Sequence, residues 1–226
     1  MEALWGGAVM ISTLAVLIAI PSLAQDRAAV VRPVEAIMDI YRAGGYNDAS
    51  DGIAPAVYSF PAGVSRILTF SSVTGMWTCN GSVPEYGPDG TSLLTGCIAP
   101  GGNNMNPVGT FSGYYSTDFS GAMVGMFLSD DLPPSAPPPL RFYNTESSQG
   151  GIPTDFKILS PLIGQVFFIG DGLTGTGSGG IQLFRVPPTA THLYLGYTDS
   201  CNGGPAPSCY SDNVGSVTAV FRIAQP

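Results

Sequence analysis

The stretch Ser216-Val-Thr-Ala-Val-Phe-Arg-Ile223 near the end of the chain alternates in polarity. Every second position from Val217 to Ile223 is apolar, whereas Thr218 and Arg222 fall on the opposite face. Alternation with a period of two is typical of a strand that buries one face. This stretch therefore predicts a β-strand that lies against a core.

Similar short apolar runs recur from Asp51 onward, separated by clusters of Gly, Pro, Asn and Ser. The further predicted strands are Ala56–Phe60, Arg66–Ser72, Ala122–Leu128, Val166–Ile169, Ile181–Val186 and Leu193–Tyr197. Several short strands between turn signals favour an all-β, antiparallel β-sandwich. The 30 Gly and 20 Pro among 226 residues argue against long helices.

Residues 25–50 differ from the rest, and we interpret them as an N-terminal extension. The apolar residues in it are spaced by three and four positions, which predicts a short helix between Arg27 and Arg42. Those residues are Val31, Val34, Ile37, Met38 and Tyr41. Pro33 suits a first helical turn, and Gly44-Gly45 would end the helix. The segment could act as a spacer or dock a protein of an envelope or membrane complex.

The first 24 residues have the pattern of a targeting segment. Ala8 to Ile20 is almost wholly apolar, and Ser22-Leu23-Ala24 provides a cleavage signal. Residues 1–24 are therefore predicted to be a signal peptide. The alternative is an uncleaved membrane anchor, because no Lys or Arg precedes the apolar run and Ala3–Leu23 approaches the roughly 20 residues that span a bilayer. Either interpretation predicts a secreted, periplasmic or cell-surface protein, in a compartment where disulfides form.

The charge balance and the rare residues exclude several functions. A net charge of −8 is unsuited to binding nucleic acid. A single histidine, His192, excludes a His-rich zinc site. No credible nucleophile–base pair is identifiable, so we expect a noncatalytic protein. The segment Gly170–Gly180 lacks the Lys of a phosphate-binding loop and is predicted to be a hairpin connection.

The most informative polar segment runs from Tyr197 to Ser216, between two predicted strands. It contains Asp199, Asp212 and Asn213 in a backbone rich in Gly and Pro. Calcium takes six to eight oxygen ligands from carboxylates, amides and carbonyls, and such a loop can supply them. The alternative is that these residues only cap their own turns.

These residues also carry a resemblance to the calcium-dependent galactophilic bacterial lectins. Asp199, the loop after it and Tyr210-Ser-Asp-Asn-Val-Gly-Ser216 resemble that family's calcium loop and closing strand. Further matches are Trp77 with Tyr86-Gly-Pro-Asp-Gly90, Gly121-Ala-Met-Val124 and Phe184-Arg-Val-Pro187. The resemblance covers about Asp51 to Ile223. It implies a lectin-like jelly-roll sandwich over residues 51–226, with a Pro-rich insertion near 130–161.

The resemblance also implies a set of calcium ligands and a sugar site. The implied ligands are Asn80 and Cys209 through their carbonyls and Asp199, Asp212 and Asn213 through their side chains. In the family two sugar hydroxyls complete the calcium shell, so Asp199 and Asp212 would also contact a saccharide. Tyr86 could stack on it. The expected function is calcium-dependent binding of a glycan.

Two departures from the family pattern leave a second function open. The sugar-selecting His and Gln of the family align with Leu94 and Cys97, which cannot donate the same hydrogen bonds. The fold could therefore serve as a noncatalytic structural subunit or cap of a membrane or cell-envelope complex.

The four cysteines are Cys79, Cys97, Cys201 and Cys209, and three pairings are open to them. We favour Cys79 with Cys97 and Cys201 with Cys209, since this pairing closes each loop beside the expected site.

Overall fold

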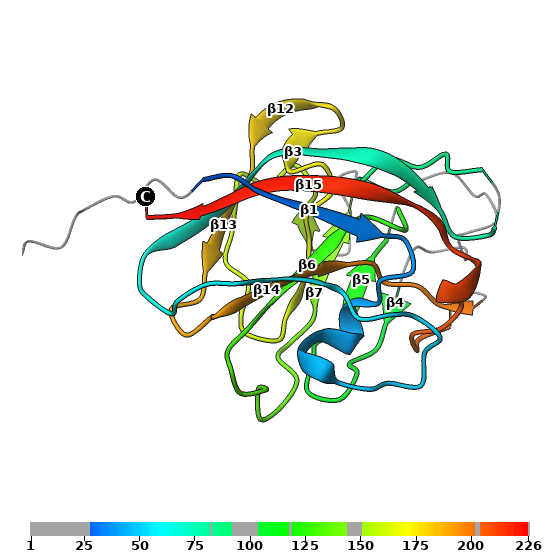
Figure 1. Cartoon of the computed structure of the whole chain (residues 1–226), viewed down its shortest axis with the longest axis horizontal. Helices are drawn as coiled ribbons and strands as arrows, with labels where there is room; N and C mark the ends of the chain where they lie inside the picture. Colours follow the sequence, from blue (N-terminus) through cyan, green and yellow to red (C-terminus); the bar gives the residue numbers. More distant parts are fainter. Residues whose placement is uncertain are drawn as a thin grey trace, which may run out of the picture.

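The fold is almost entirely β-structure, as shown by a computed structural model (Figure 1). The structure describes residues 28–81, 83–91, 104–117, 119–143, 151–201 and 204–225. The strands within them are β1 (Val30–Glu35), β2 (Ala56–Ser59), β3 (Arg66–Thr78), β4 (Asn104–Met105), β5 (Tyr114–Ser116), β6 (Val124–Leu128), β7 (Leu140–Tyr143), β8 (Ile152–Pro153), β9 (Ile158–Leu159), β10 (Val166–Phe168), β11 (Leu173–Gly175), β12 (Ser178–Ile181), β13 (Leu183–Val186), β14 (His192–Gly196) and β15 (Val214–Ala224). Two 3₁₀ helices, η1 (Ile40–Gly45) and η3 (Tyr210–Asp212), accompany them.

Two larger sheets contribute most of the core. One has the order β1-β15-β3-β13-β9, and the other has the order β10-β6-β14-β2. Aromatic side chains of the two sheets touch, since the ring of Phe221 lies 5.5 Å from Tyr58 and the ring of Phe184 lies 5.4 Å from Phe167. The two sheets therefore face one another over a shared apolar layer.

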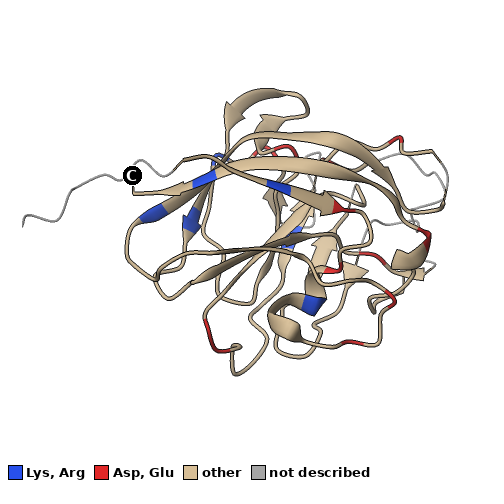
Figure 2. Cartoon of the chain, in the orientation of Figure 1, with Lys and Arg blue, Asp and Glu red and all other residues tan. Residues whose placement is uncertain are grey.

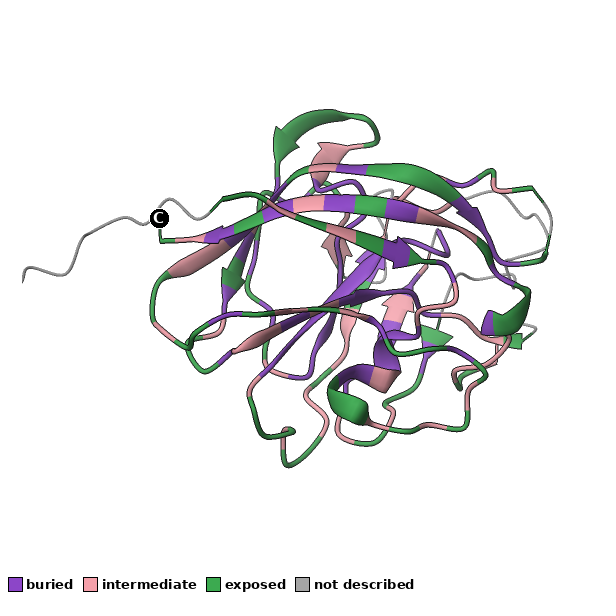
Figure 3. Ribbon diagram, in the orientation of Figure 1, coloured by how far each residue is buried: buried purple, intermediate pink, exposed green. Residues whose placement is uncertain are grey.

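The alternating burial of β15 follows its sequence. Val217, Ala219, Phe221 and Ile223 are all buried, whereas Thr218 and Arg222 are exposed. Figure 3 shows these alternating bands along β15. The strand lies between β1 and β3 and pairs antiparallel with both. It therefore joins the edge strand β1 to the rest of the first sheet.

The prediction of an all-β fold is confirmed, and each predicted strand overlaps an observed one. The strand predicted at Arg66–Ser72 is longer than expected, because β3 continues to Thr78 as the partner of β15. Pairing is not uniformly antiparallel, since β9 runs parallel to β13 and β7 runs parallel to both β5 and β8.

The predicted helix between Arg27 and Arg42 is wrong over the residues described. Val30–Glu35 is instead the edge strand β1, hydrogen-bonded along β15. Pro33 is compatible with this place because an edge strand needs hydrogen bonds on one side only. The interpretation of residues 25–50 as a separate extension is also wrong from Val30 onward. Ile40 and Tyr41, in η1, are fully buried in the common core and are not free to dock a partner.

The predicted insertion near 130–161 contains strands that pair with other parts of the chain. Its strands β7 and β8 join β4 and β5 in a third sheet, and β9 extends the first sheet. The predicted hairpin at Gly170–Gly180 is confirmed, since β11 and β12 pair antiparallel. The predicted signal peptide or anchor, residues 1–24, lies outside the described residues. Within the described part of the chain, no helix has the length and apolar character needed to cross a membrane.

Candidate functional site: a loop end with unpaired buried oxygens

The loop between β14 and β15 is held by a disulfide and by its own backbone. Cys201 and Cys209 are bonded, with their Cα atoms 5.2 Å apart. The Ser208 N–H donates to the Asp199 carbonyl at 3.1 Å, and the Cys201 N–H donates to the Ser208 hydroxyl at 3.0 Å. The predicted pairing of these two cysteines is confirmed. Cys79 is also disulfide-bonded, and its predicted partner Cys97 lies outside the described residues.

Tyr210 anchors this loop to the beginning of the chain. Its buried hydroxyl donates to Asp39 Oδ1 at 3.0 Å and accepts the Asp199 N–H at 3.0 Å. Its own N–H donates to Asp51 Oδ1 at 2.8 Å. The Ser211 N–H adds a 3.2 Å bond to Asp51 Oδ2. The loop is therefore positioned by two carboxylates from the segment that follows β1.

Those two carboxylates, Asp39 and Asp51, have opposite environments. Hydrogen bonds from the Ser211 side chain and from the Tyr210 and Ser211 N–H groups lower the pKa of Asp51. Burial raises the pKa of Asp39 to about 7, against the opposing hydrogen bonds from Ser50 and the Tyr41 N–H. Neither residue was predicted to belong to the site. Asp51 lies 159 positions before its partner Tyr210, so no local pattern connects them.

Asp199 and Asn213 present oxygen atoms that have no partner. The Ser200 N–H donates to Asp199 Oδ1 at 2.7 Å, but Asp199 Oδ2 is buried without a hydrogen bond. The Asn213 Nδ2 donates to the Ala36 carbonyl at 3.0 Å, which fixes the amide orientation. Asn213 Oδ1 is likewise buried without a partner. A buried acceptor that has lost water and gained no donor is costly, so each of these two oxygens calls for an electropositive partner.

The pKa of Asp199 reflects the same environment. Burial, assisted by the negative charges of Asp212 and Asp51, raises this pKa from 3.8 to about 7. The Asn213 side chain and the Ser200 N–H act in the opposite direction but do not offset the burial. A divalent cation would reverse this balance, because an opposite charge close to a carboxylate favours its ionised form.

The other predicted ligands lie around this pair. The Gly81 N–H donates to the Asp212 carbonyl at 2.6 Å, so the segment containing Asn80 lies against the segment containing Asp212. The side chain of Asn80 is directed to Thr78, whose hydroxyl donates to its Oδ1 at 3.0 Å. Cys209 has a left-handed backbone with φ of 64°, which turns the chain into η3. The structure thus brings together the two separate turns from which the resemblance draws its ligands.

Tyr86 does not have the place expected of a sugar-stacking residue. It is only 6% exposed, and its backbone pairs with Trp77 in an isolated bridge. Its ring lies edge-on to Trp77, with the centroids 6.1 Å apart. The ring is used in packing and offers no open face to a ligand, so the stacking role is wrong. Trp77 itself belongs to the core, since it is 2% exposed.

The donor set of the loop end fits a hard cation and excludes a soft one. Among the described residues, no group of three or more His, Cys, Asp and Glu side chains converges on one point. The available donors are carboxylate, amide and carbonyl oxygens, which are the ligands that calcium takes. Figure 2 shows acidic residues gathered around this loop end and most of the Lys and Arg residues toward the opposite end of the sheet.

A second turn with carboxylates lies at the β11–β12 hairpin, and there both oxygens of the buried aspartate are hydrogen-bonded. Asp171 is 8% exposed, and each of its carboxylate oxygens accepts a backbone N–H. Oδ1 is bonded to Leu173 N at 2.8 Å and Oδ2 to Gly177 N at 2.6 Å. The Asp171 N–H in turn donates to Asp89 Oδ1 at 2.8 Å. This turn lies beside a small cavity, in which Asp89 is a lining residue.

Comparisons of this chain with models of protein families, with curated proteins and with solved structures found no match.

Proposed function

We propose that this chain is an exported, noncatalytic, calcium-dependent carbohydrate-binding protein built on a lectin-like jelly roll. The observation that supports it most directly is the pair of buried oxygens without partners, Asp199 Oδ2 and Asn213 Oδ1. Their places match the side-chain ligands that the resemblance to galactophilic lectins implies. The facing sheets and the joined turns at Gly81 and Asp212 are compatible with that fold.

The residues of the loop end have distinct parts in such a site. Asp199 and Asn213 would hold the ion through their side chains, with Asp212 as a further carboxylate and with carbonyls from Asn80 and Cys209. The Cys201–Cys209 disulfide and the Tyr210 hydroxyl limit the freedom of the loop, so the ligand oxygens are arranged before the ion arrives. Calcium would supply open positions to which neighbouring hydroxyl groups of a saccharide bind.

The test is a glycan array probed with the full chain, once with calcium and once with a chelator. We expect binding to at least one class of saccharide that is lost with the chelator and lost in Asp199→Ala. The matched control is Asp131→Ala, an exposed carboxylate in the β6–β7 connection, which should bind as the wild type does. Equal signals with calcium and chelator, or no signal at all, would contradict calcium-dependent recognition.

A structural role in an envelope or membrane complex is the second candidate. Leu94 and Cys97 stand where the lectin family has its sugar-selecting His and Gln. The docking of a partner through residues 25–50 loses its basis from Val30 onward, because that part is built into the sheet and core. If calcium raises the melting temperature but no glycan binds, the structural role is favoured.

A further inference from the structure

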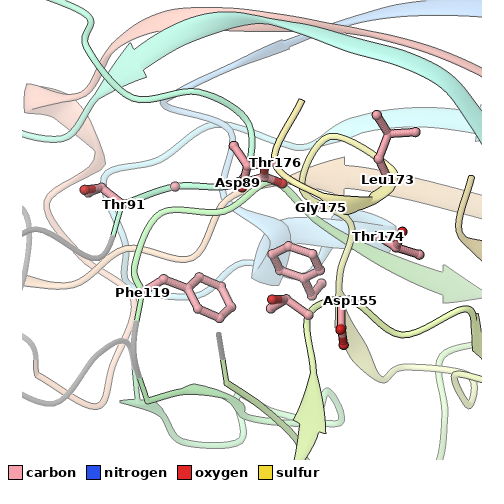
Figure 4. A pocket seen from close by; sticks show the side chains of 11 residues that line it. Asp89, Thr91, Phe119, Asp155, Leu173, Thr174, Gly175 and Thr176 are labelled. Carbon is pink, nitrogen blue, oxygen red and sulfur yellow. The ribbon is translucent and has the colours of Figure 1, made fainter. Parts of the chain in front are cut away.

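A small cavity lies between the β11–β12 hairpin and the turn at Asp89 (Figure 4). It has a volume of about 200 Å³ and shares no residue with the loop end around Asp199. Pockets for drug-sized ligands have volumes of about 300–1,000 Å³, so this cavity suits a ligand of a single ring.

The lining of the cavity excludes an anionic ligand. Among the described residues that line it, none is Lys, Arg or His, whereas Asp89 and Asp155 are both present. A carboxylate of the ligand would meet like charges with no compensating cation. The ligand is therefore neutral or positively charged.

Hydroxyl groups are the most frequent polar groups in the lining. They come from Thr91, Thr154, Thr174 and Thr176. A hydroxyl donates one hydrogen bond and accepts others, so such a lining matches a ligand that both donates and accepts at several positions. An ammonium group donates only, so it would not use the donor capacity of these hydroxyls.

Asp89 is the strongest acceptor of the cavity, and neighbouring groups hold it in place. Its Oδ1 accepts the Asp171 N–H, and the Thr176 hydroxyl also hydrogen-bonds to its side chain. Figure 4 shows Asp89 and Thr176 close together at one side of the cavity. A carboxylate has about four acceptor sites, so acceptor capacity remains for a ligand hydroxyl.

Gly170 provides the room for this arrangement. It has φ of +59°, and a Cβ there would lie 2.2 Å from Asp89 Oδ1 and 2.5 Å from the ring of Phe168. The backbone therefore approaches the carboxylate and the ring more closely than any other residue would allow.

The remaining lining includes two aromatic residues. The rings of Phe119 and Phe168 pack edge to face with centroids 5.3 Å apart, and both residues line the cavity. Both rings are packed into the core, at 4% and 3% exposed, so they add only small apolar edges to a wall that is otherwise polar. A mostly polar wall suits a ligand with several hydroxyl groups, such as a pyranose.

We propose that this cavity is a calcium-independent subsite for one neutral pyranose unit. Asp89 accepts hydroxyl groups of the sugar, the threonines donate to and accept from the others, and ring edges of Phe119 and Phe168 border the site. The subsite does not depend on the calcium site, because neither shares a residue with the other.

The experiment is saturation-transfer NMR on the full chain with a panel of neutral methyl pyranosides. It is run in the Asp199→Ala variant with chelator present, so that any calcium-dependent binding is removed. We expect at least one glycoside to bind, with its ring C–H protons saturated most strongly. Asp89→Asn should weaken that binding at least tenfold, and Thr154→Val should weaken it several-fold.

Matched controls separate binding from folding. Asp131→Asn and Thr218→Val change exposed residues outside the cavity and should leave the affinity unchanged, and circular dichroism should show the same fold in all variants. The proposal is overturned if no glycoside binds, if Asp89→Asn binds as well as its parent, or if methylammonium binds where the glycosides do not. A calcium-dependent signal on the array together with no signal here would reject the subsite and leave the proposed function standing.

Discussion

Asp199 and Asp171 lie in two different turns, and they differ in how many of their carboxylate oxygens are hydrogen-bonded. Both oxygens of Asp171 accept backbone N–H groups of the β11–β12 hairpin. In Asp199 only Oδ1 is bonded, and Oδ2 is buried without a partner. The carboxylate of the hairpin is thus fully hydrogen-bonded within the chain. At the loop end one carboxylate oxygen has no partner within the chain, so a bound ion or ligand would have to supply one.

Calcium should have the largest effect, and it should act through Asp199. A ligand present at 1,000 times its dissociation constant stabilises the folded state by about 4 kcal/mol. For a chain of this size that corresponds to a rise in melting temperature of roughly 8–16 °C. We expect Asp199→Ala and Asp212→Ala each to abolish this rise in a thermal melt.

The wild type measured with calcium and with a chelator provides the reference for these variants. Identical melting curves in the two conditions would contradict calcium binding at the loop end, and the loop end would then not differ from the hairpin in its need for an ion. Magnesium should be tested in parallel, because its strict octahedral geometry suits such a loop less well.

Asp171→Ala should destabilise the protein by about 2–4 kcal/mol, since hydrogen bonds to a charged acceptor contribute about 1.5–3 kcal/mol each. The loss should be the same with calcium and with chelator. Urea denaturation under both conditions measures it, with Asp131→Ala as the exposed control. A loss that appeared only with chelator would show that the hairpin, too, depends on the ion.

Removal of the Cys201–Cys209 disulfide in the double Ser variant should cost about 2–3 kcal/mol in the chain-entropy model for a loop this short. It should also weaken calcium binding, because the bridge restrains the loop that carries the ligands. Isothermal titration calorimetry measures the affinity. An unchanged affinity would mean that Tyr210, with its bonds to Asp39 and Asp199, positions the loop by itself.

The pH dependence should be the most gradual effect, at most about 1.4 kcal/mol per pH unit for one proton. With chelator present, the pKa of Asp199 is about 7 in the folded state against 3.8 as the ordinary value. A raised carboxylate pKa stabilises the fold at low pH, so this contribution is lost between about pH 4 and pH 7.

The difference between wild type and Asp199→Asn isolates this contribution from that of Asp39, whose pKa is also raised. Stability measured by urea denaturation at several pH values should fall more steeply in the wild type than in the variant. Parallel curves would show that Asp199 does not have a raised pKa in the folded state.

The strands were predictable because their signal is local. Alternation along Ser216–Ile223 reports directly on which side chains face the core, and the structure buries the same four. Residues 30–35 were not predictable in this way, because the spacing of their apolar residues also fits a helix. Pairing with β15, a strand almost 190 positions away, decides their conformation.

The loop end was predictable only in part for the same reason. Asp199 and Asn213 lie within one polar segment, so the sequence places them together. Asp39 and Asp51 come from the other end of the chain, and only the fold brings them to Tyr210. The hairpin that contains Asp171 was predicted, but its contact with Asp89 was not, because no spacing links a residue before β4 to a hairpin after β10.

The position of β15 also has a consequence for synthesis. This strand is synthesised after every other strand of its sheet, yet it lies inside that sheet, between β1 and β3. Until it emerges, both neighbours expose unpaired edges that could join other chains. Assembly of that sheet must therefore wait until β15 has emerged, and a chain that ends before Val214 should aggregate instead of forming a smaller version of the fold.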